Sequence, residues 1–310
     1  MQLGAYITTL NRPLLLEQTL QIMRSQTRPP SHVLVVDNAG SDETRRVVSS
    51  FPSAWATYQA MNENVGPAGA GAYALDRLSR HGYEWIYCGD DDDPPQSSDT
   101  LERLLAVAEG TGEDTGAVGA VGARWDWSAG TMRRLPDDAL HGVVEVDVIG
   151  GNGQLIVRRD VLARVGLPDS RLFFGLDDVD YCLRIRTAGY RVLVDGDLMR
   201  ACRTKAGRLN LKHRTSLVPR HSYDTIWRQY YSTRNYIFTM RRTFGHPRLA
   251  RRELFKAMGR ACFSWGRGLS YGSAFTSMQL RGIIDGYVGH MGRTVLPTPK
   301  YATPAPRPPS

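Results

Sequence analysis

The sequence has few of the features from which disulfide frameworks, metal knuckles and membrane spans are built. Its 310 residues include four cysteines, none in a Cys-x-x-Cys pair: Cys88, Cys182, Cys202 and Cys262. This spacing favours reduced thiols in a cytoplasmic protein. No apolar run reaches the roughly 18 residues that cross a bilayer, and the N-terminus starts with a strand-like run instead of a signal peptide. We therefore expect a soluble protein.

Acidic residues are scarce in the C-terminal third. The net charge is +8, and between Arg200 and Arg260 the chain has 16 Lys and Arg residues against two acids, Asp224 and Glu253. A basic region of this kind serves nucleic acid, anionic lipid or a phosphorylated small molecule. The charge alone selects none of the three.

Two familiar phosphate-binding signatures are also absent. Residues 64–71 read Asn-Val-Gly-Pro-Ala-Gly-Ala-Gly, a Gly-rich stretch that opens a predicted helix. They match neither Gly-x-Gly-x-x-Gly nor the P-loop, which ends in Gly-Lys-Ser/Thr. This counts against a dinucleotide oxidoreductase and a P-loop enzyme. Two uses remain open, an anion site at the helix N-terminus and a turn where close packing demands small residues.

Apolar strands and amphipathic helices alternate through the first part of the chain. Strands are predicted at 3–9, 33–36, 56–61, 85–88, 117–123, 143–149, 154–157 and 190–194. Helices are predicted at 13–25, 41–48, 69–80, 101–108 and 160–165, and from Asp177 to Gly189. Residues 125–141 lack such a pattern and are expected to form an insertion or lid. The order implies an α/β fold with a doubly wound, mainly parallel sheet.

The chain is expected to divide into three parts. Residues 1–222 form the α/β domain, and residues 223–297 form a helical C-terminal region, with helices expected to about Arg242 and from Leu249 to Ser264. Residues 298–310 are a Pro-rich tail.

Polar residues collect in the loops that follow the predicted strands, where ligands of such sheets bind. They include Thr9 and Arg12, then Asp37, then Asn64, then the quartet Asp90 to Asp93. Crowded carboxylates suit Mg²⁺ or Mn²⁺ shared with substrate phosphates, although an acidic turn before a helix is an equal alternative. Asp37 fits either a ribose or base contact or a cap on the next helix.

A second acidic group, Asp177, Asp178 and Asp180, lies at the start of a predicted helix. The helix dipole there favours an ionised carboxylate, which can act as a general base toward a substrate hydroxyl. The alternative is an N-cap with solvent-facing neighbours.

Several segments, taken in order, resemble the family 2 inverting glycosyltransferases. They are residues 8–13 (Thr-Thr-Leu-Asn-Arg-Pro), 26–30, 35–44 (Val-Val-Asp-Asn-Ala-Gly-Ser-Asp-Glu-Thr), 62–66, 89–95, 152–153, 173–174 and 177–180 with Arg184. Residues 230–235 (Tyr-Tyr-Ser-Thr-Arg-Asn) and 281–286 are similar to the bacterial rhamnosyl- and galactofuranosyltransferase branch. The resemblance covers nearly the whole chain.

The resemblance implies a GT-A fold, a UDP- or dTDP-sugar donor and an Mg²⁺ or Mn²⁺ cofactor. It assigns donor binding to Thr9, Arg12, Asp37, Asn64, Asp90 and Asp91, and metal binding to Asp90 and Asp92, with His221 as a candidate third ligand. It assigns the general base to Asp178 and the acceptor side to Asp177, Asp180 and Asn152. One departure concerns the metal: many relatives carry a histidine where this chain has Cys202. Either His213 or His221 replaces it, or Arg203 or Lys205 stabilises the diphosphate instead.

We therefore predict an inverting hexosyltransferase that acts on a lipid-linked cell-surface glycan or a natural product. A sugar-phosphate nucleotidyltransferase is the first alternative, but its Gly-rich basic signature is absent near the N-terminus. A non-catalytic basic binding protein is the second, and it leaves both aspartate groups unexplained. Nucleic acid is not expected as a partner.

A cytoplasmic location is predicted, and peripheral contact with the inner face of the plasma membrane stays open. The segment from Arg251 to Trp265 carries Phe255, Met258 and Cys262 near basic residues. It suits an anionic membrane, and it equally suits packing against the catalytic domain. The donor sugar, the acceptor and the oligomeric state are not defined by the sequence.

Overall fold

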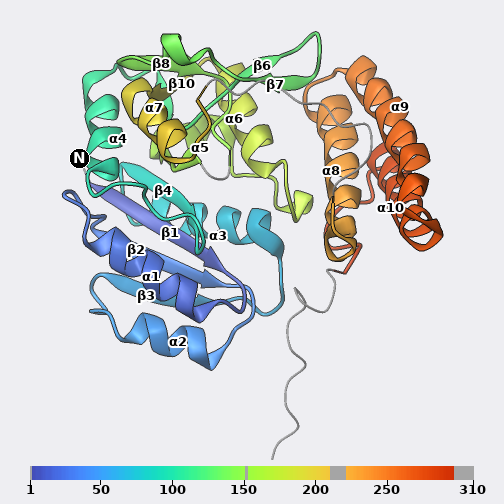
Figure 1. Cartoon of the computed structure of the whole chain (residues 1–310). Coiled ribbons are helices and arrows are strands. Elements are labelled where there is room, and N and C mark those ends of the chain that lie inside the picture. The colour runs from blue at the N-terminus through green and yellow to red at the C-terminus, as the bar shows by residue number, and fades with distance from the viewer. Residues whose placement is uncertain (1, 151–152, 210–220, 297–310) are drawn as a thin grey trace, which may run out of the picture. The chain divides into compact units, whose positions relative to one another are not determined.

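The computed structural model describes residues 2–150, 153–209 and 221–296. The chain divides into two compact units (Figure 1). The first unit consists of Met1–Glu63, Gly69–Asp169 and Asp178–Lys212, and the second consists of Asn64–Ala68, Ser170–Asp177 and His213–Ser310. Each unit is described by itself below.

An eight-stranded sheet forms the centre of the first unit, in the order β3-β2-β1-β4-β9-β5-β10-β8. The strands are β1 (Leu3–Thr9), β2 (His32–Asp37), β3 (Ala56–Ala60), β4 (Trp85–Asp90), β5 (Thr115–Gly119), β8 (Val143–Val146), β9 (Leu155–Arg158) and β10 (Arg191–Asp195). The pairs β3/β2, β2/β1, β1/β4 and β5/β10 are parallel, whereas β9 and β8 run antiparallel to their neighbours. The predicted mainly parallel α/β sheet is confirmed.

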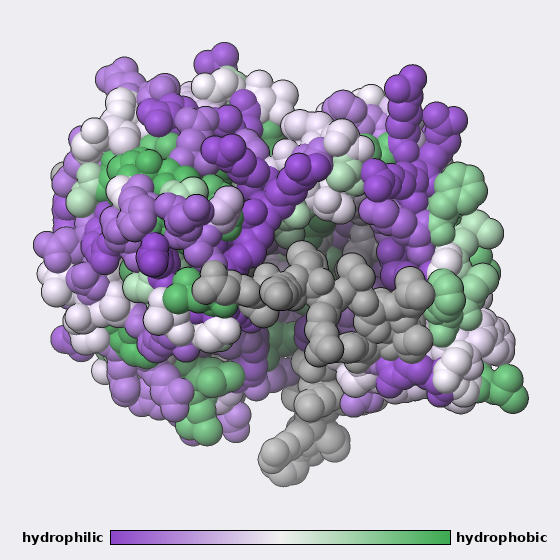
Figure 2. All heavy atoms as spheres, turned by 45° about the horizontal axis from the view of Figure 1, so that its top comes forward, coloured by the Kyte–Doolittle hydropathy of each residue, from purple (hydrophilic) through white to green (hydrophobic). Residues whose placement is uncertain are grey.

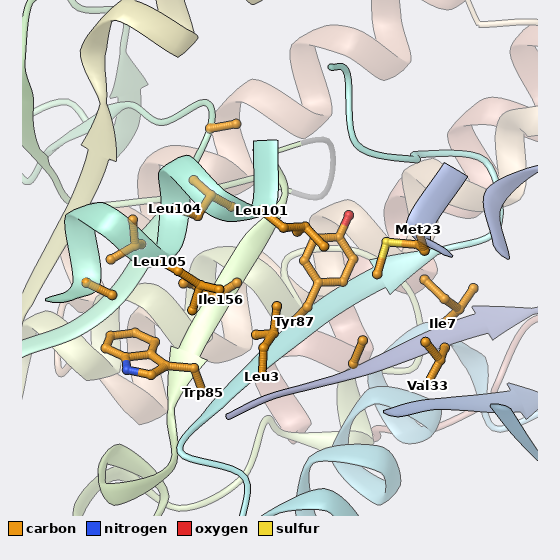
Figure 3. Packing of buried hydrophobic residues seen from close by; sticks show 14 of the residues in the cluster. Leu3, Ile7, Met23, Val33, Trp85, Tyr87, Leu101, Leu104, Leu105 and Ile156 are labelled. Atoms are coloured by element: carbon orange, nitrogen blue, oxygen red, sulfur yellow. The ribbon is translucent and has the colours of Figure 1, made fainter. Parts of the chain in front are cut away.

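Helices cover both faces of this sheet, because side chains alternate along each buried strand. On one face, Leu3 and Ile7 of β1 share a core with side chains of α1 (Pro13–Arg24), α2 (Asp42–Ser49), α4 (Thr100–Gly110) and α7 (Gly196–Lys205). Figure 3 shows Met23 of α1 and Leu101 of α4 in the same layer as Tyr87 of β4. This layer is the main hydrophobic core.

The opposite face is covered by α3 (Gly66–Arg80), α5 (Arg159–Val165) and α6 (Asp177–Thr187). Close approach is visible at two glycines. A Cβ on Gly71 would lie 3.0 Å from the Tyr6 hydroxyl of β1, and one on Gly116 would lie 2.9 Å from Ile185 of α6. The chain is therefore doubly wound, as the element order predicts.

Two details differ from the sequence-based expectation in the first unit. The segment 125–141, expected to be irregular, contains a hairpin of β6 (Arg124–Asp126) and β7 (Thr131–Arg133), followed by the short helix η1 (Asp137–Ala139). The helix α7 was not predicted. It begins at Asp195, whose side chain accepts a hydrogen bond from the amide of Leu198 at 2.9 Å.

The second unit is helical in its C-terminal part. It contains η3 (Ser170–Leu172), η4 (Tyr223–Thr225), α8 (Ile226–Phe238), the π-helical turn η5 (Thr239–Thr243), α9 (Pro247–Ser264), η6 (Trp265–Arg267) and α10 (Leu269–Val288). The helix α10 lies in the region expected to be helical but was not predicted as a separate element, and its glycines lower helix propensity. The structure explains them: a Cβ on Gly282 or Gly286 would lie 2.8 Å from a carbonyl oxygen of α8. These glycines allow the two helices to pack closely.

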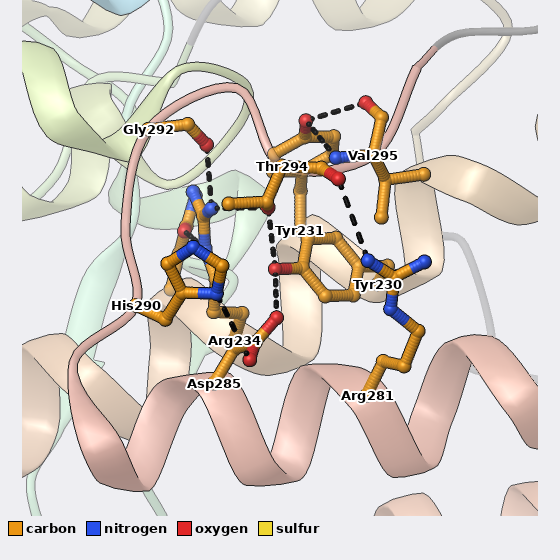
Figure 4. A network of polar contacts seen from close by, with 10 residues as sticks. Tyr230, Tyr231, Arg234, Arg281, Asp285, His290, Gly292, Thr294 and Val295 are labelled. Carbon is orange, nitrogen blue, oxygen red and sulfur yellow. Dashed lines mark hydrogen bonds and ion pairs between the residues drawn. The ribbon is translucent and has the colours of Figure 1, made fainter.

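A buried arginine organises the second unit (Figure 4). Arg234 is fully buried and its guanidinium lies over the rings of Tyr230 and Tyr231, at 5.4 and 4.7 Å from their centroids. It donates to the carbonyl oxygens of Gly292 and Leu172 at 2.6 and 2.8 Å. Carbonyl dipoles and aromatic faces thus stabilise a charge that has left water.

The two tyrosines belong to this core. Their ring centroids lie 5.0 Å apart, and both side chains are fully buried.

Among the residues that the structure describes, no helix is long and apolar enough to cross a membrane.

Candidate active site

The aspartate quartet begins at the carboxyl end of β4, next to the end of β1. The parallel register places Thr8 beside Asp90, and the Thr8 hydroxyl donates a hydrogen bond to the Asp90 carboxylate. The next residue pair repeats the contact one step later, because Thr9 donates to Asp91 at 2.6 Å. The Thr8-Thr9 pair thus holds two consecutive acids at one edge of the sheet.

Asp91 points into the protein. Its side chain is fully buried and forms an ion pair with Arg12 at 2.7 Å, while Thr19 of α1 donates to its carbonyl oxygen at 2.6 Å. Arg12 also contacts the exposed Asp92 at 2.5 Å. One guanidinium therefore ties the β1 loop to two acids of the quartet.

Burial and mutual repulsion raise the pKa values of three members of the quartet. Burial raises the pKa of Asp91 to about 7, although Thr9 and Arg12 lower it. Burial, followed by the charges of Asp92 and Asp90, also raises the pKa of Asp93 to about 7. For Asp90 burial is again the main cause, and the charges of Asp92 and Asp178 raise its pKa further. Crowded acids whose pKa values rise together mark a place where a cation would relieve repulsion.

Asp178 belongs to the same electrostatic environment. It lies in the first turn of α6, half-buried, and its Oδ1 accepts a hydrogen bond from the amide of Val179 at 2.7 Å. A Cβ on Gly150 would lie 3.6 Å from its Oδ2, so that oxygen faces backbone without a side chain. Since the charge of Asp178 is felt at Asp90, the structure brings the two predicted acidic groups of the first unit together.

The other predicted acceptor-side residues have different surroundings. Asp180 is 2% exposed and forms an ion pair with Arg184 at 2.8 Å. Arg184 also donates to the carbonyl oxygens of Val165 and Leu167, so this pair fastens α6 to the end of α5. Asp177 is half-buried in the second unit, and Asn152 lies outside the described residues. Their acceptor-side roles stay predictions.

Asp37 and Asn64 each stabilise a local turn. Asp37 is fully buried, and its carboxylate accepts hydrogen bonds from the amides of Ala39 and Ser41 at 2.8 and 2.9 Å and from the Tyr58 hydroxyl at 3.0 Å. The cap of α2 is Ser41, which accepts from the Thr44 amide, so Asp37 orders the preceding loop instead. A donor contact of Asp37 stays a prediction.

The Gly-rich stretch serves close packing. The Asn64 side chain accepts a hydrogen bond from the amide of Gly66 at 2.9 Å. Gly66 has φ +71°, and a Cβ there would lie 2.1 Å from the carbonyl oxygen of Phe173. Only glycine fits this position. Of the two uses left open by the sequence, the structure shows the small-residue turn.

The residues proposed to compensate for Cys202 occupy distinct places. Cys202 is half-buried on α7, within electrostatic range of Asp93. Arg203 is buried, forms an ion pair with Asp137 at 2.5 Å and donates to the Leu135 carbonyl oxygen at 2.9 Å. Its guanidinium therefore supports the fold, whereas the exposed Lys205 donates to the Gln96 carbonyl oxygen at 3.1 Å.

Histidine ligation is not tested by this geometry. His221 belongs to the second unit, and burial, followed by the charges of Arg260 and Arg267, lowers its pKa. This favours the neutral imidazole that binds metals. Its role as a ligand stays a prediction, and His213 lies outside the described residues.

The carboxylates of the quartet suit a metal ion whose coordination is completed by substrate phosphates. Within residues 2–150, 153–209 and 221–296, no three His, Cys, Asp or Glu side chains are grouped to hold a metal ion by themselves. Mg²⁺, however, is commonly held by one or two carboxylates together with substrate phosphates. Asp90 and Asp92 could provide two such hard oxygen ligands, and burial together with the nearby charge of Asp92 raises the pKa of Asp90.

Sequence reasoning missed two residues of this site. Thr8 and Thr19 hold Asp90 and Asp91 from β1 and α1, and neither was singled out as a contact. The contact of Thr8 could have been predicted from the sequence, because parallel strands that end together place their last residues side by side. Thr19 was not, because its contact depends on the angle at which α1 crosses the sheet.

Comparison with solved structures identifies the fold as that of GT-A glycosyltransferases. The mannosyltransferase PcManGT from Pyrobaculum calidifontis, in complex with GDP-Man and Mn²⁺, superposes with a TM-score of 0.52 at 20% identity, covering 93% of this chain and 86% of that one. GalNAc-T7 with UDP, GalNAc and Mn²⁺ gives a TM-score of 0.53 at 14% identity, covering 63% of this chain and 42% of that one. At sequence identities this low, the structural similarity defines the fold alone and not the activity.

The sequence comparison then relates part of the chain to one family. Residues 5–149, just under half of the chain, match the family model described as glycosyl transferase family 2. The galactofuranosyltransferase GlfT1 of Mycobacterium tuberculosis is 31% identical over 202 residues, which cover 60% of this chain and 64% of that protein. The matched part thus spans just under two thirds of the relative's length.

Proposed function

We propose that the protein is an inverting glycosyltransferase that moves a hexosyl group, galactofuranose first among the candidates, from a UDP- or dTDP-sugar to a glycan hydroxyl. The single observation that carries this proposal is the position of Asp178. It lies at a helix N-terminus within electrostatic range of Asp90, in a chain whose residues 5–149 match the family 2 model. The similarity to the galactofuranosyltransferase GlfT1 supports galactofuranose as the sugar. Residues 1–222 bind the donor in this proposal, and residues 223–297 form the acceptor side.

The proposed reaction is a single displacement at the anomeric carbon. The acceptor oxygen forms a bond to this carbon while the bond to the diphosphate breaks on the opposite face, so the configuration inverts. Asp178 takes the proton from the acceptor hydroxyl, and the nucleoside diphosphate leaves with the electron pair of the broken bond. A positioned base of this kind contributes about 10²- to 10⁴-fold to the rate.

Two groups of the chain hold this base in place. The Val179 amide donates to Oδ1 of Asp178, which leaves Oδ2 beside the Gly150 backbone. The dipole of α6 stabilises the negative charge of the ionised carboxylate. Both groups favour an ionised Asp178 carboxylate whose Oδ1 is held in place.

Asp90 and Asp92 are proposed to bind Mg²⁺ or Mn²⁺ together with the donor. When bound, such an ion neutralises charge on the diphosphate and makes it a better leaving group. Thr8 fixes the orientation of the Asp90 carboxylate, and Arg12 supports Asp92 from the β1 loop. The Mn²⁺ in the two similar folds supports this assignment.

The test compares Asp178→Asn with Asp160→Asn, which alters an exposed acid at the start of α5. We expect Asp178→Asn to reduce transfer from UDP-galactofuranose at least about 10²-fold while donor binding, measured by thermal shift, stays intact. Asp160→Asn is expected to retain both. Full transfer by Asp178→Asn would reject the base assignment.

A second experiment tests the donor and the metal together. A thermal-shift panel of UDP-, dTDP- and GDP-sugars with and without Mn²⁺ reveals the donor, because a bound ligand stabilises the folded state. We expect a UDP- or dTDP-sugar to respond and the response to require the ion. Transfer that is undiminished by EDTA would contradict the metal assignment.

A further inference from the structure

The outer side of α9 carries bulky apolar side chains that the fold leaves exposed. Phe255, Met258, Cys262, Trp265 and Leu269 follow one another at intervals of three or four residues along α9, η6 and the start of α10. Within α9 this spacing places Phe255, Met258 and Cys262 along one side of the helix. Trp265 of η6 and Leu269, the first residue of α10, follow them in the chain. Phe255 is 70% exposed, Met258 48%, Trp265 45% and Leu269 79%. These five residues are called the α9 stripe below.

The α9 stripe is not the packing face of its helix. The buried residues of α9 are Leu249, Ala250, Ala257, Ala261 and Ser264, which are mostly small. They lie on the side of α9 that contacts α8 and α10. Within the second unit, small residues of α9 pack inward and large apolar residues of the α9 stripe face outward.

The charges around the α9 stripe have one sign. Arg248 and Arg251 are exposed on the turns preceding it, and Arg267 is exposed near its other end. Between residues 247 and 284 the sequence contains a single acid, Glu253. Its side chain is 12% exposed and forms an ion pair with Arg260 at 2.6 Å. The solvent therefore meets apolar side chains edged by positive charge.

We propose that the α9 stripe docks on an anionic lipid bilayer. A helix that lies in a membrane interface combines an exposed apolar side with flanking Arg and Lys residues, which attract anionic headgroups. A second copy of this chain would bring equal positive charges together. Nucleic acid would satisfy the charges but leave Phe255 and Leu269 without an apolar partner. Figure 2 shows green apolar surface on its right-hand side, where α9 and α10 lie in Figure 1.

The binding experiment uses the full chain and two kinds of vesicle, phosphatidylcholine alone and phosphatidylcholine mixed with phosphatidylglycerol. We expect the protein to sediment with the mixed vesicles, and binding to weaken as salt is raised. Phe255→Ser with Leu269→Ser is expected to weaken this binding about tenfold or more, because two apolar side chains no longer enter the interface. The matched control is Leu14→Ser, which alters a side chain of α1 that is 74% exposed.

Two further measurements separate the apolar and the electrostatic contributions. Arg248→Gln with Arg251→Gln is expected to reduce binding to the mixed vesicles and to flatten its salt dependence. Alkylation of the exposed Cys262 by iodoacetamide is expected to slow when mixed vesicles are added. Burial raises the pKa of the Cys88 and Cys182 thiols to about 12 and also raises the pKa of the half-buried Cys202, so Cys262 is the most reactive of the four thiols.

The proposal does not depend on transferase activity, because none of these measurements requires turnover. It is overturned if the wild-type chain ignores the mixed vesicles at low salt, or if the Phe255 and Leu269 variant binds them as well as the wild type. It is also overturned if the chain is a dimer without vesicles and the same variant makes it a monomer, because the α9 stripe would then be covered by a second copy.

Discussion

Arg12 and Asp91 form an ion pair of 2.7 Å in which the Asp91 side chain is fully buried and the Arg12 side chain is 41% exposed. The pair connects the loop after β1 to the end of β4. Because Arg12 also contacts Asp92, it couples an inward-facing acid to an outward-facing one. Asp91 thereby supports the edge of the sheet from which Asp90 and Asp92 face the proposed donor.

Removing this arginine is expected to destabilise the first unit. In Arg12→Ala the buried carboxylate of Asp91 keeps the Thr9 hydroxyl but loses its ionic partner. We expect the free energy of unfolding to fall by about 1–2 kcal/mol, less than for a fully buried pair because solvent screens Arg12. Urea unfolding at neutral pH measures the change.

The control for this variant is Arg28→Ala. Arg28 forms an ion pair of the same length with Glu109, but both side chains are at least 35% exposed. Exposed pairs contribute little, so we expect a change within about 0.5 kcal/mol. Equal losses in the free energy of unfolding of the two variants would show that the burial of Asp91 does not strengthen its ion pair.

The elements that the sequence predicts well are those in which one pattern dominates. The run Leu3–Thr9 is apolar enough to form a central strand, and its predicted bounds match β1. Ser41 has the residue type and position of an N-cap and acts as one. In these places local chemistry and tertiary packing favour the same structure.

The sequence fails where a distant partner decides. The helix α10 lies within the predicted helical region, but the close packing of its glycines on the backbone of α8 is known only from the structure. The tight bonding of Asp37 within its own turn, and of Arg234 among carbonyl oxygens and tyrosine rings, also depends on tertiary contacts. In the candidate site, the acids were predicted from their crowding, but Thr19 was found only through the packing of α1.

Asp126 is expected to give the β6–β7 hairpin a defined pH dependence. Hydrogen bonds from Ser128 and the Ala129 amide, together with the charge of Arg133, lower its pKa to about 2. The ionised form is therefore favoured in the folded state. Its stabilising effect is complete above the ordinary pKa of about 4 and is lost as the pH falls to about 2.

An NMR titration of the Asp126 carboxyl carbon measures this pKa directly. We expect a midpoint near 2 in the wild type, and a rise toward the ordinary value of about 3.9 in Ser128→Ala with Arg133→Gln. A wild-type midpoint at the ordinary value would contradict the hydrogen bonding seen at this turn.

Asn235 is expected to be the main anchor of the loop before α6. Its side-chain amide donates to the carbonyl oxygens of Leu172, Phe174 and Gly175 at 3.0, 3.1 and 2.8 Å. Phe173 and Leu176 of the same loop have φ of +62° and +69°, conformations that few residues with side chains adopt. The three hydrogen bonds help to stabilise this strained backbone.

Asn235→Ala removes this donor from the three carbonyl oxygens, of which that of Leu172 keeps the guanidinium of Arg234. We expect a loss of about 1–3 kcal/mol in the free energy of unfolding, because the half-buried carbonyl oxygens of Phe174 and Gly175 lose their side-chain donor. Ser232→Ala, on the exposed side of the same helix, should change it by less than about 0.5 kcal/mol. Chemical denaturation distinguishes the two, and a small effect of Asn235→Ala would mean that the loop holds its shape without this side chain.

Gly66 gives a sharp test of how the Gly-rich stretch is used. An alanine there would need φ near +71° and would place its Cβ 2.1 Å from the Phe173 carbonyl oxygen. We expect Gly66→Ala to lower the free energy of unfolding by about 3 kcal/mol or more, because the strained backbone and the clash with the Phe173 carbonyl oxygen both destabilise the folded state. Thermal or chemical unfolding measures the change.

The matched control is Gly110→Ala at the end of α4, where no atom of another element lies within 4 Å of the new Cβ. That variant should be neutral or stabilised by up to about 1 kcal/mol, since alanine favours helix over glycine. If Gly66→Ala were as stable as Gly110→Ala, close packing would not explain this glycine, and an anion site at the start of α3 would become the better interpretation.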